Sequence, residues 1–182
     1  TLGILHQAIG SSYRALGNRT SSIEHYRAAV PLLEAQLGQV SDTALLARYD
    51  LAYALTIAAE FDAARAELDT ADQLAGDLLL LSNPIALQSA VRRGQLHSQQ
   101  FQPREALPFY ERASALMNSG VTVHPQLRVV VRQEYADTLL RLNRPNEVIA
   151  LLSPHTEFPT EGQRGSHHRI LGRAYRALED YQ

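Results

Sequence analysis

Small and bulky apolar residues recur along the chain at helical spacing, and polar or glycine-containing breaks separate them. Residues 11–30 read "SSYRALGNRTSSIEHYRAAV". Tyr13 stands in one apolar stripe, the stripe is interrupted at Gly17, and a second stripe holds Tyr26 and Ala29. Apolar residues three or four positions apart share one helix face, and glycine often ends a helix. The stretch therefore predicts two helices joined by a short turn.

The pattern of this hairpin returns along the chain with a step of 42 residues, and with a last step of 36. One position of each first helix holds a small residue, at Gly10, Ala52, Gly94, Ala136 and Gly172. Three residues later stand Tyr13, Leu55, His97, Leu139 and Tyr175. The second helices hold three further columns: Ser22, Ala64, Ala106 and Val148; Tyr26, Leu68, Tyr110 and Leu152; and Ala29, Ala71, Ala113 and His155. Self-similarity at a fixed step indicates a solenoid, in which stacked hairpins bury a shared core.

Turn and proline signals fall between these helices, as stacked hairpins require. The breaks are Gly17-Asn18, Ala59-Glu60, Gln102-Pro103, Asn143-Arg144-Pro145 and Glu179-Asp180. Because proline suits the first turn of a helix, four prolines predict helix starts, at Pro84, Pro103, Pro125 and Pro145. Two others lie inside predicted second helices, Pro31 and Pro108. Ser21 and Glu24 have the spacing of a capping box, and Ser153 with Pro154 predicts an early end of the fourth second helix.

Three stretches resemble the tetratricopeptide repeat (TPR) family: "IGSSYRALG", "IEHYRAAV" and "LGRAYRALEDY". The step of 42 residues, longer than the usual step of about 34, is similar to that of kinesin light chain and of many bacterial regulatory proteins. The resemblance implies an all-α, right-handed superhelical α-solenoid of antiparallel helix pairs. We expect one array with repeats at 1–40, 41–82, 83–124 and 125–160, followed by the first helix of a fifth repeat at 161–182.

The resemblance also implies a concave surface that is lined by first helices and binds an extended or helical peptide. Transferred helix by helix, this groove comprises Gln7, Ser11, Arg14, Tyr49, Asp50, Tyr53, Ile57, Arg92, Gln95, Gln99, Gln133, Glu134, Asp137, Arg141, Arg169, Arg173 and Arg176. Residues at i, i+3 and i+4 share a helix face, so each helix can present its set together.

Several of these side chains have two interpretations. Tyr49 and Tyr53 either contact a peptide or pack within the array. The arginines of residues 169–176 either bind a ligand carboxylate or phosphate, or form a solvated face. Glu134 and Asp137 either face a ligand or pair within the chain, with an arginine such as Arg92 or Arg173.

Composition excludes several other functions. A net charge of -2 gives no general attraction to nucleic acid, and the longest aliphatic run, 78–81, is far shorter than the roughly 20 residues that span a bilayer. The chain has no Cys, which leaves the redox compartment open, and all 17 of its basic residues are Arg. No His pair has the i, i+4 spacing of a helical metal site, and there is no G-x-S-x-G motif. We therefore expect no metal, no cofactor and no enzymatic activity.

These observations favour a non-enzymatic module that binds a protein or peptide. The alternative is a sensory or regulatory TPR domain of a bacterial signalling protein, such as a winged-helix transcriptional regulator or a Ser/Thr kinase. The chain begins with Thr and has no signal-like segment, so we expect it to be part of a longer protein. Since an uncapped array end exposes apolar surface, we also expect self-association through the C-terminal end.

Overall fold

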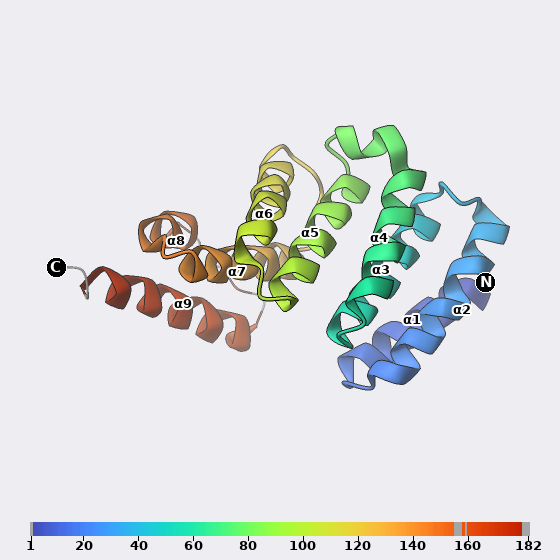
Figure 1. Ribbon diagram of the computed structural model, residues 1–182, viewed down its shortest axis with the longest axis horizontal. Coiled ribbons are helices and arrows are strands. Elements are labelled where there is room, and N and C mark those ends of the chain that lie inside the picture. Colours follow the sequence, from blue (N-terminus) through green and yellow to red (C-terminus); the bar gives the residue numbers. More distant parts are fainter. Residues whose placement is uncertain (1, 155–157, 159, 180–182) are drawn as a thin grey trace.

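In the computed structural model, which describes residues 2–154, 158 and 160–179, the ordered elements are helices and no strand is found among those residues. Figure 1 shows them as a row of helix pairs, with α1 and α2 at one end and α9 at the other. The elements are α1 (Leu2–Ala15), α2 (Arg19–Leu37), α3 (Asp42–Ile57), α4 (Phe61–Ala75), the short η1 (Gly76–Leu80), α5 (Pro84–Gln99), α6 (Pro103–Asn118), α7 (Pro125–Arg141), α8 (Pro145–Leu152) and α9 (Glu161–Glu179). The predicted all-helical fold of packed pairs is confirmed.

The ends of the helices follow local sequence signals. Proline is the first residue of α5, α6, α7 and α8, as predicted, where its missing N–H costs no helical hydrogen bond. Two prolines do lie inside helices, Pro31 in α2 and Pro108 in α6. Helix α8 ends at Leu152, directly before the predicted Ser153-Pro154 stop.

One predicted cap is wrong. The N-cap of α2 is Asn18, whose side-chain oxygen accepts a hydrogen bond from the Ser21 backbone N–H at 3.1 Å. Ser21 therefore already lies within the helix and does not form a capping box with Glu24. Asn and Ser both cap helices well, and the earlier of the two residues takes the position here.

The small column explains how the two helices of a hairpin approach each other. A Cβ atom added to Gly10 would lie 3.2 Å from Cγ of Tyr26, and one added to Gly94 would lie 3.0 Å from Cζ of Tyr110. Ala52 and Ala136 are fully buried at the equivalent positions. Helices can pack this closely only where one side contributes a very small residue.

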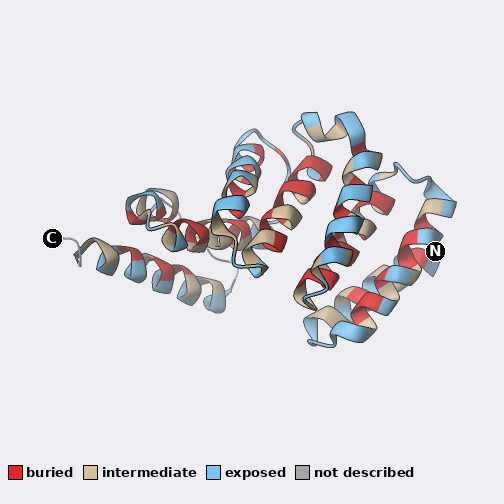
Figure 2. Cartoon of the chain, viewed as in Figure 1, coloured by how far each residue is buried: buried red, intermediate tan, exposed pale blue. Residues whose placement is uncertain are grey.

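The second-helix columns are buried as well, and Figure 2 shows the buried residues on the facing sides of the helices. In the first-helix columns, Tyr13 and His97 are half-buried, and two positions near the C-terminal end of the array are more open. Gly172 of α9 is exposed and has nothing within 4 Å of its added Cβ, and Tyr175 is half exposed. His155 lies outside the described residues.

First helices also contact each other from repeat to repeat: α3 contacts α5, α5 contacts α7, and α7 contacts α9. They therefore form a continuous inner row, on which side chains from distant parts of the sequence meet. Among the described residues, no helix is both long enough and apolar enough to cross a membrane.

Candidate functional site

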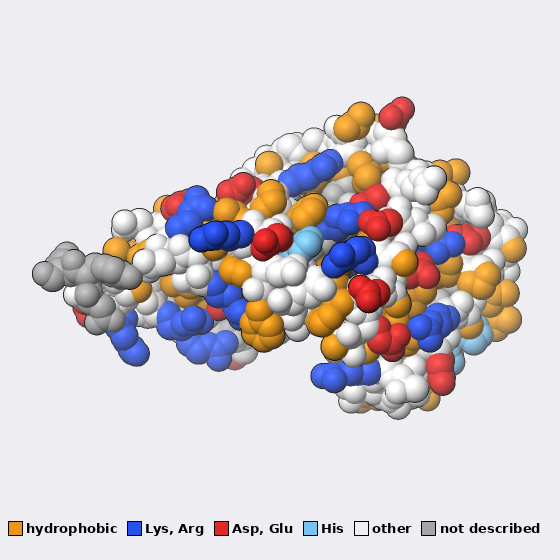
Figure 3. Space-filling model, in the orientation of Figure 1, with side chains coloured by type: hydrophobic (Ala, Val, Ile, Leu, Met, Phe, Trp, Pro, Cys, Tyr) orange, Lys and Arg blue, Asp and Glu red, His pale blue; other side chains and the backbone are white. Residues whose placement is uncertain are grey.

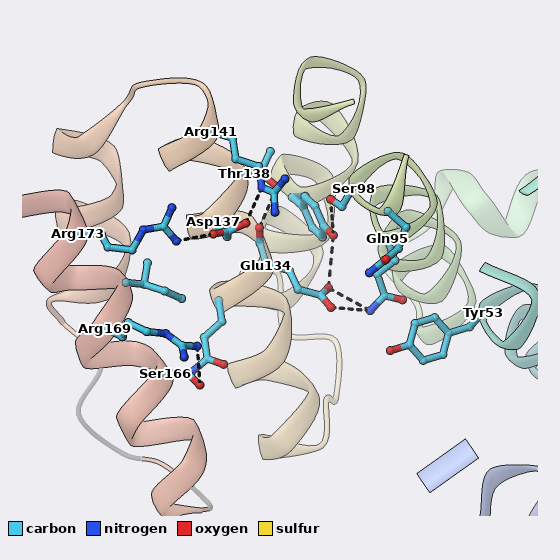
Figure 4. Close-up of a pocket in the computed structure, with 14 residues that line it drawn as sticks. Tyr53, Gln95, Ser98, Glu134, Asp137, Thr138, Arg141, Ser166, Arg169 and Arg173 are labelled. Carbon is cyan, nitrogen blue, oxygen red and sulfur yellow. Dashed lines mark hydrogen bonds and ion pairs between the residues drawn. The ribbon is translucent and has the colours of Figure 1, made fainter. Parts of the chain in front are cut away.

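A pocket of about 290 Å³ opens along this inner row, between α3, α5, α7 and α9 (Figure 4). Nine of the predicted site residues line it: Tyr53, Gln95, Gln99, Gln133, Glu134, Asp137, Arg141, Arg169 and Arg173. The repeat geometry thus brings together residues that are up to 120 positions apart in the sequence. It does so because equivalent faces of successive first helices lie next to each other.

Five lining residues were not predicted: Ser98, Tyr110, Thr138, Ser166 and Ile170. Ser98 and Thr138 stand three and four positions after the predicted Gln95 and Glu134, so helical spacing was a usable signal for them. Tyr110 had no such signal, because it belongs to a buried column of a second helix. Its hydroxyl reaches between the helices, lies 3.1 Å from Ser98 Oγ and donates to Glu134 Oε2 at 3.4 Å.

Predicted residues from four successive repeats are joined by a chain of hydrogen bonds, which we call the polar ladder. Gln7 Nε2 of α1 donates to Asp50 Oδ2 of α3 at 3.2 Å. Arg92 of α5 donates from Nη2 to Asp50 Oδ1 at 3.0 Å and from Nη1 to Gln95 Oε1 at 3.1 Å. Gln95 Nε2 then donates to both carboxylate oxygens of Glu134 on α7, at 3.0 Å each. The ladder fixes side chains along the inner row, and we refer to the ladder and the pocket together as the groove.

Tyr53 lies between the two parts of the groove and is held there by arginines. Its ring centroid is 4.3 Å from Cζ of Arg92 and 5.4 Å from Cζ of Arg14. Arg14 is itself within reach of Ser11, donating to its Oγ at 3.4 Å. Guanidinium groups over an aromatic face are attracted to it, so the ring forms a fixed, partly buried platform.

Tyr49 does not line the groove, although the sequence placed it beside Tyr53. Its side chain is fully buried, and its hydroxyl donates to Asp72 Oδ1 of α4 at 2.7 Å. Burial, followed by this hydrogen bond to a carboxylate, raises the pKa of Tyr49. The prediction of a ligand contact is wrong for this residue, and the packing alternative describes it.

Arg176 and Ile57 lie outside both the main pocket and the polar ladder. Arg176 is exposed on α9. Ile57 is half-buried and lines a separate, smaller pocket of about 130 Å³ with Arg14.

Glu134 is a carboxylate of the groove whose pKa is shifted by its surroundings. Burial raises its pKa to about 7, even though the Gln95 hydrogen bond, the charge of Arg92 and the Tyr110 hydrogen bond all act to lower it. The ion pair with Arg92 that the sequence offered as an alternative is not formed, because Arg92 pairs with Asp50. Among the described residues, none forms an ion pair with Glu134.

The opposite side of the pocket is basic, and we call Arg141, Arg169 and Arg173 the arginine wall. Asp137 Oδ2 accepts from Arg141 Nε at 2.7 Å, and Asp137 Oδ1 accepts from Arg173 Nη1 of α9 at 3.0 Å. Of the two interpretations of Asp137, the structure shows the pairing within the chain, with Arg173. Among the described residues, the Arg169 side chain hydrogen-bonds to the hydroxyl of Ser166 alone, at 3.4 Å. With three cations against one carboxylate, the wall has an excess of positive charge, and arginines gather over α9 in Figure 3.

Within the described part of the chain, no three His, Asp or Glu side chains are grouped as a metal site needs. His6 Nδ1 and His25 Nδ1 lie 3.0 Å apart, between α1 and α2 and away from the pocket.

Comparisons with known proteins agree with this architecture. The sequence model of the tetratricopeptide repeat matches residues 5–31. The fold is similar to that of a Podosopora anserina protein described as a kinesin light chain with nearly identical TPR-like repeats, with a TM-score of 0.74 at 19% identity over 96% of this chain and 86% of that one. A variant of the same protein gives a TM-score of 0.73 at 19% identity over 96% and 85% of the two chains. No curated protein matches the chain.

Proposed function

Since the chain folds as a tetratricopeptide-repeat array whose repeats have the form of those in kinesin light chain, we propose that it is a non-enzymatic protein-interaction module. Its ligand is a peptide segment of a partner protein, bound in the groove. The observation that carries this proposal is the pocket on the inner row, which four first helices line with fixed polar side chains beside an aromatic platform.

The groove offers the groups that a peptide needs. Extended peptides bind through backbone hydrogen bonds and through pockets for individual side chains. Gln99 is exposed and its side chain has no hydrogen-bond partner among the described residues, so its side-chain amide is available to a peptide backbone. Tyr53 supplies a rigid contact that combines apolar area with a hydroxyl.

The positive charge of the arginine wall favours a ligand that carries an acidic group. Arginine binds carboxylates through paired, charge-assisted hydrogen bonds. Arg169 and Arg173 project from the same face of α9, one turn apart, and Figure 4 shows both pointing toward the pocket. A carboxylate of the peptide can therefore contact both guanidinium groups.

The sequence and its resemblance to the TPR family also suggest a wider biological role. A role inside a bacterial regulatory protein stays a prediction, as does the division into repeats at the stated boundaries. The partner class proposed is a protein or peptide, with no direct contact to nucleic acid.

Selection from a displayed library of random peptides tests the proposed function. The immobilised chain is expected to enrich a family of related sequences, and the Arg169→Ala, Arg173→Ala double variant is expected to bind them at least about tenfold more weakly. Arg164→Ala is the matched control, because Arg164 is also on α9 but pairs with Glu161 outside the pocket. Failure to enrich any sequence, or equal loss in the control, would contradict the proposal.

A further inference from the structure

The pocket contains two carboxylates, Asp137 and Glu134, and their hydrogen-bond partners differ in charge. Asp137 accepts from two arginines of the arginine wall. Glu134 accepts only from the neutral Gln95 amide and the Tyr110 hydroxyl, and no described residue pairs with it as an ion. The pocket thus has an excess of cations on one side and an unpaired anion on the other.

The side chains that hydrogen-bond to the Glu134 carboxylate carry no charge, because the donors are the Gln95 amide and the Tyr110 hydroxyl. Tyr53 and Ser98, whose side chains also end in hydroxyl groups, line the same pocket. In Figure 4 the Tyr53 hydroxyl points toward Gln95 and Glu134 from the far side of the pocket. The charged neighbour Arg92 is already engaged by Asp50 and by the Tyr53 ring, so it leaves the carboxylate unneutralised.

We propose that the Glu134 carboxylate receives a basic side chain, arginine or lysine, of the peptide that the groove binds. This inference rests on the proposed function and names the chemistry of its ligand. A peptide with a basic residue at Glu134 and an acidic residue at the arginine wall matches the charge of both sides of the pocket.

The physical reason is the cost of an isolated charge. A carboxylate that is partly withdrawn from water and lacks a cation is destabilised in its ionised form, which is why burial raises the pKa of Glu134 to about 7. A ligand cation offsets that cost, and the Coulomb attraction is stronger there than in water. Polar neighbours already hold both carboxylate oxygens in place, so no rearrangement is needed.

This mechanism predicts how binding depends on pH. A cation prefers the ionised carboxylate, so a peptide bound at Glu134 shifts the group toward ionisation and releases a proton near pH 7. Its affinity therefore rises by up to about tenfold per pH unit from pH 5.5 toward 7 and then levels off. The other charged groups around the pocket are Arg92 on α5, Asp137 and Arg141 on α7, and Arg169 and Arg173 on α9.

The experiment compares the sequences that the same random peptide library yields on the parent chain and on Glu134→Gln. The amide of Gln keeps the shape of Glu134 and can still pair with Gln95 and Tyr110, so thermal unfolding is expected to show a folded variant. Glu147→Gln on α8 is the control, because Glu147 is half exposed and lies outside the pocket.

The parent is expected to select peptides with one recurrent basic position, which Glu134→Gln no longer selects and Glu147→Gln still does. A selected peptide should bind Glu134→Gln about tenfold more weakly at pH 7.5 and without the rise in affinity between pH 5.5 and 7. Peptides without a recurrent basic position, or a basic preference that survives Glu134→Gln, would overturn the inference and leave the proposed function standing. If the parent selects no peptide, both are overturned.

Discussion

The amide of Gln95 on α5 donates to both carboxylate oxygens of Glu134 on α7, at 3.0 Å each. This contact joins the third and fourth helix pairs at the floor of the pocket. It also places a partly buried carboxylate under a neutral donor, with no arginine in ion-pair contact among the described residues. The carboxylate is therefore oriented but not neutralised.

The free energy of unfolding should depend on pH through the ionisation of Glu134. Its pKa is about 7 in the folded chain against a reference value of 4.5, so the folded state holds a proton that the unfolded state has lost between these pH values. The carboxylate therefore destabilises the fold increasingly as pH rises from 4.5 to 7. Chemical unfolding should show Glu134→Gln gaining up to about 3 kcal/mol relative to the parent across this window. A constant difference at all pH values would contradict the assignment.

Gly94 should be intolerant of a side chain. An added Cβ would lie 3.0 Å from the Tyr110 ring, which is fully buried and held by its hydroxyl contacts with Ser98 and Glu134. We expect Gly94→Ala to lower the free energy of unfolding by about 1–2 kcal/mol, because overpacking outweighs the better helix propensity of alanine.

Gly172→Ala is the control for that substitution. Gly172 holds the same place in the repeat, yet nothing lies within 4 Å of its added Cβ. Alanine there should stabilise the chain by about 0.5–1 kcal/mol, as in any exposed helix. Equal effects of the two substitutions in urea unfolding would argue against close helix approach at Gly94.

Tyr49 should matter for stability and not for binding. Tyr49→Phe removes the donor to Asp72, whose Oδ2 still accepts from Arg93 Nε at 2.6 Å. We expect a loss of about 1–2 kcal/mol in the free energy of unfolding, against less than about 0.5 kcal/mol for Tyr175→Phe at a half-exposed site. Weaker binding of a selected peptide to folded Tyr49→Phe would show that this residue belongs to the ligand site after all.

The outer face of α9 should support self-association. At the position of Gly172, the other first helices are covered by the second helix of their own pair, whereas Gly172 is open and Tyr175 is 51% exposed. We expect sedimentation equilibrium to show a concentration-dependent dimer that Tyr175→Glu weakens. A parent chain that stays monomeric at its highest soluble concentration would refute this prediction.

The positions at which each repeat buries an apolar residue were predictable from the sequence alone. Each helix pair packs in the same way, so the same residue types recur at the repeat step. The columns that contain Gly10 and Tyr26 show this, since their equivalents are buried wherever a second helix of the same pair covers them. The exposed Gly172 follows the same rule, as no described helix covers it.

Positions of polar side chains were less predictable. Tyr49 and Tyr53 are one turn apart, but four residues turn a helix by about 40° beyond a full rotation, and this is enough to direct Tyr49 toward Asp72 and Tyr53 into the groove. Tyr110 reaches the pocket from a second helix, because its long side chain packs across Gly94, which has no side chain to block it. Such details depend on packing across repeats, which the spacing of residues within one helix does not contain.

The central claim is that the groove is the peptide-binding surface, and Tyr53 tests it most directly. Isothermal titration of one library-selected peptide should give at least about tenfold weaker binding to Tyr53→Ala than to the parent, while Tyr49→Phe binds as the parent does. Circular dichroism should confirm that both variants are folded. Equal affinity of the parent and Tyr53→Ala would contradict the claim and place the peptide on another surface.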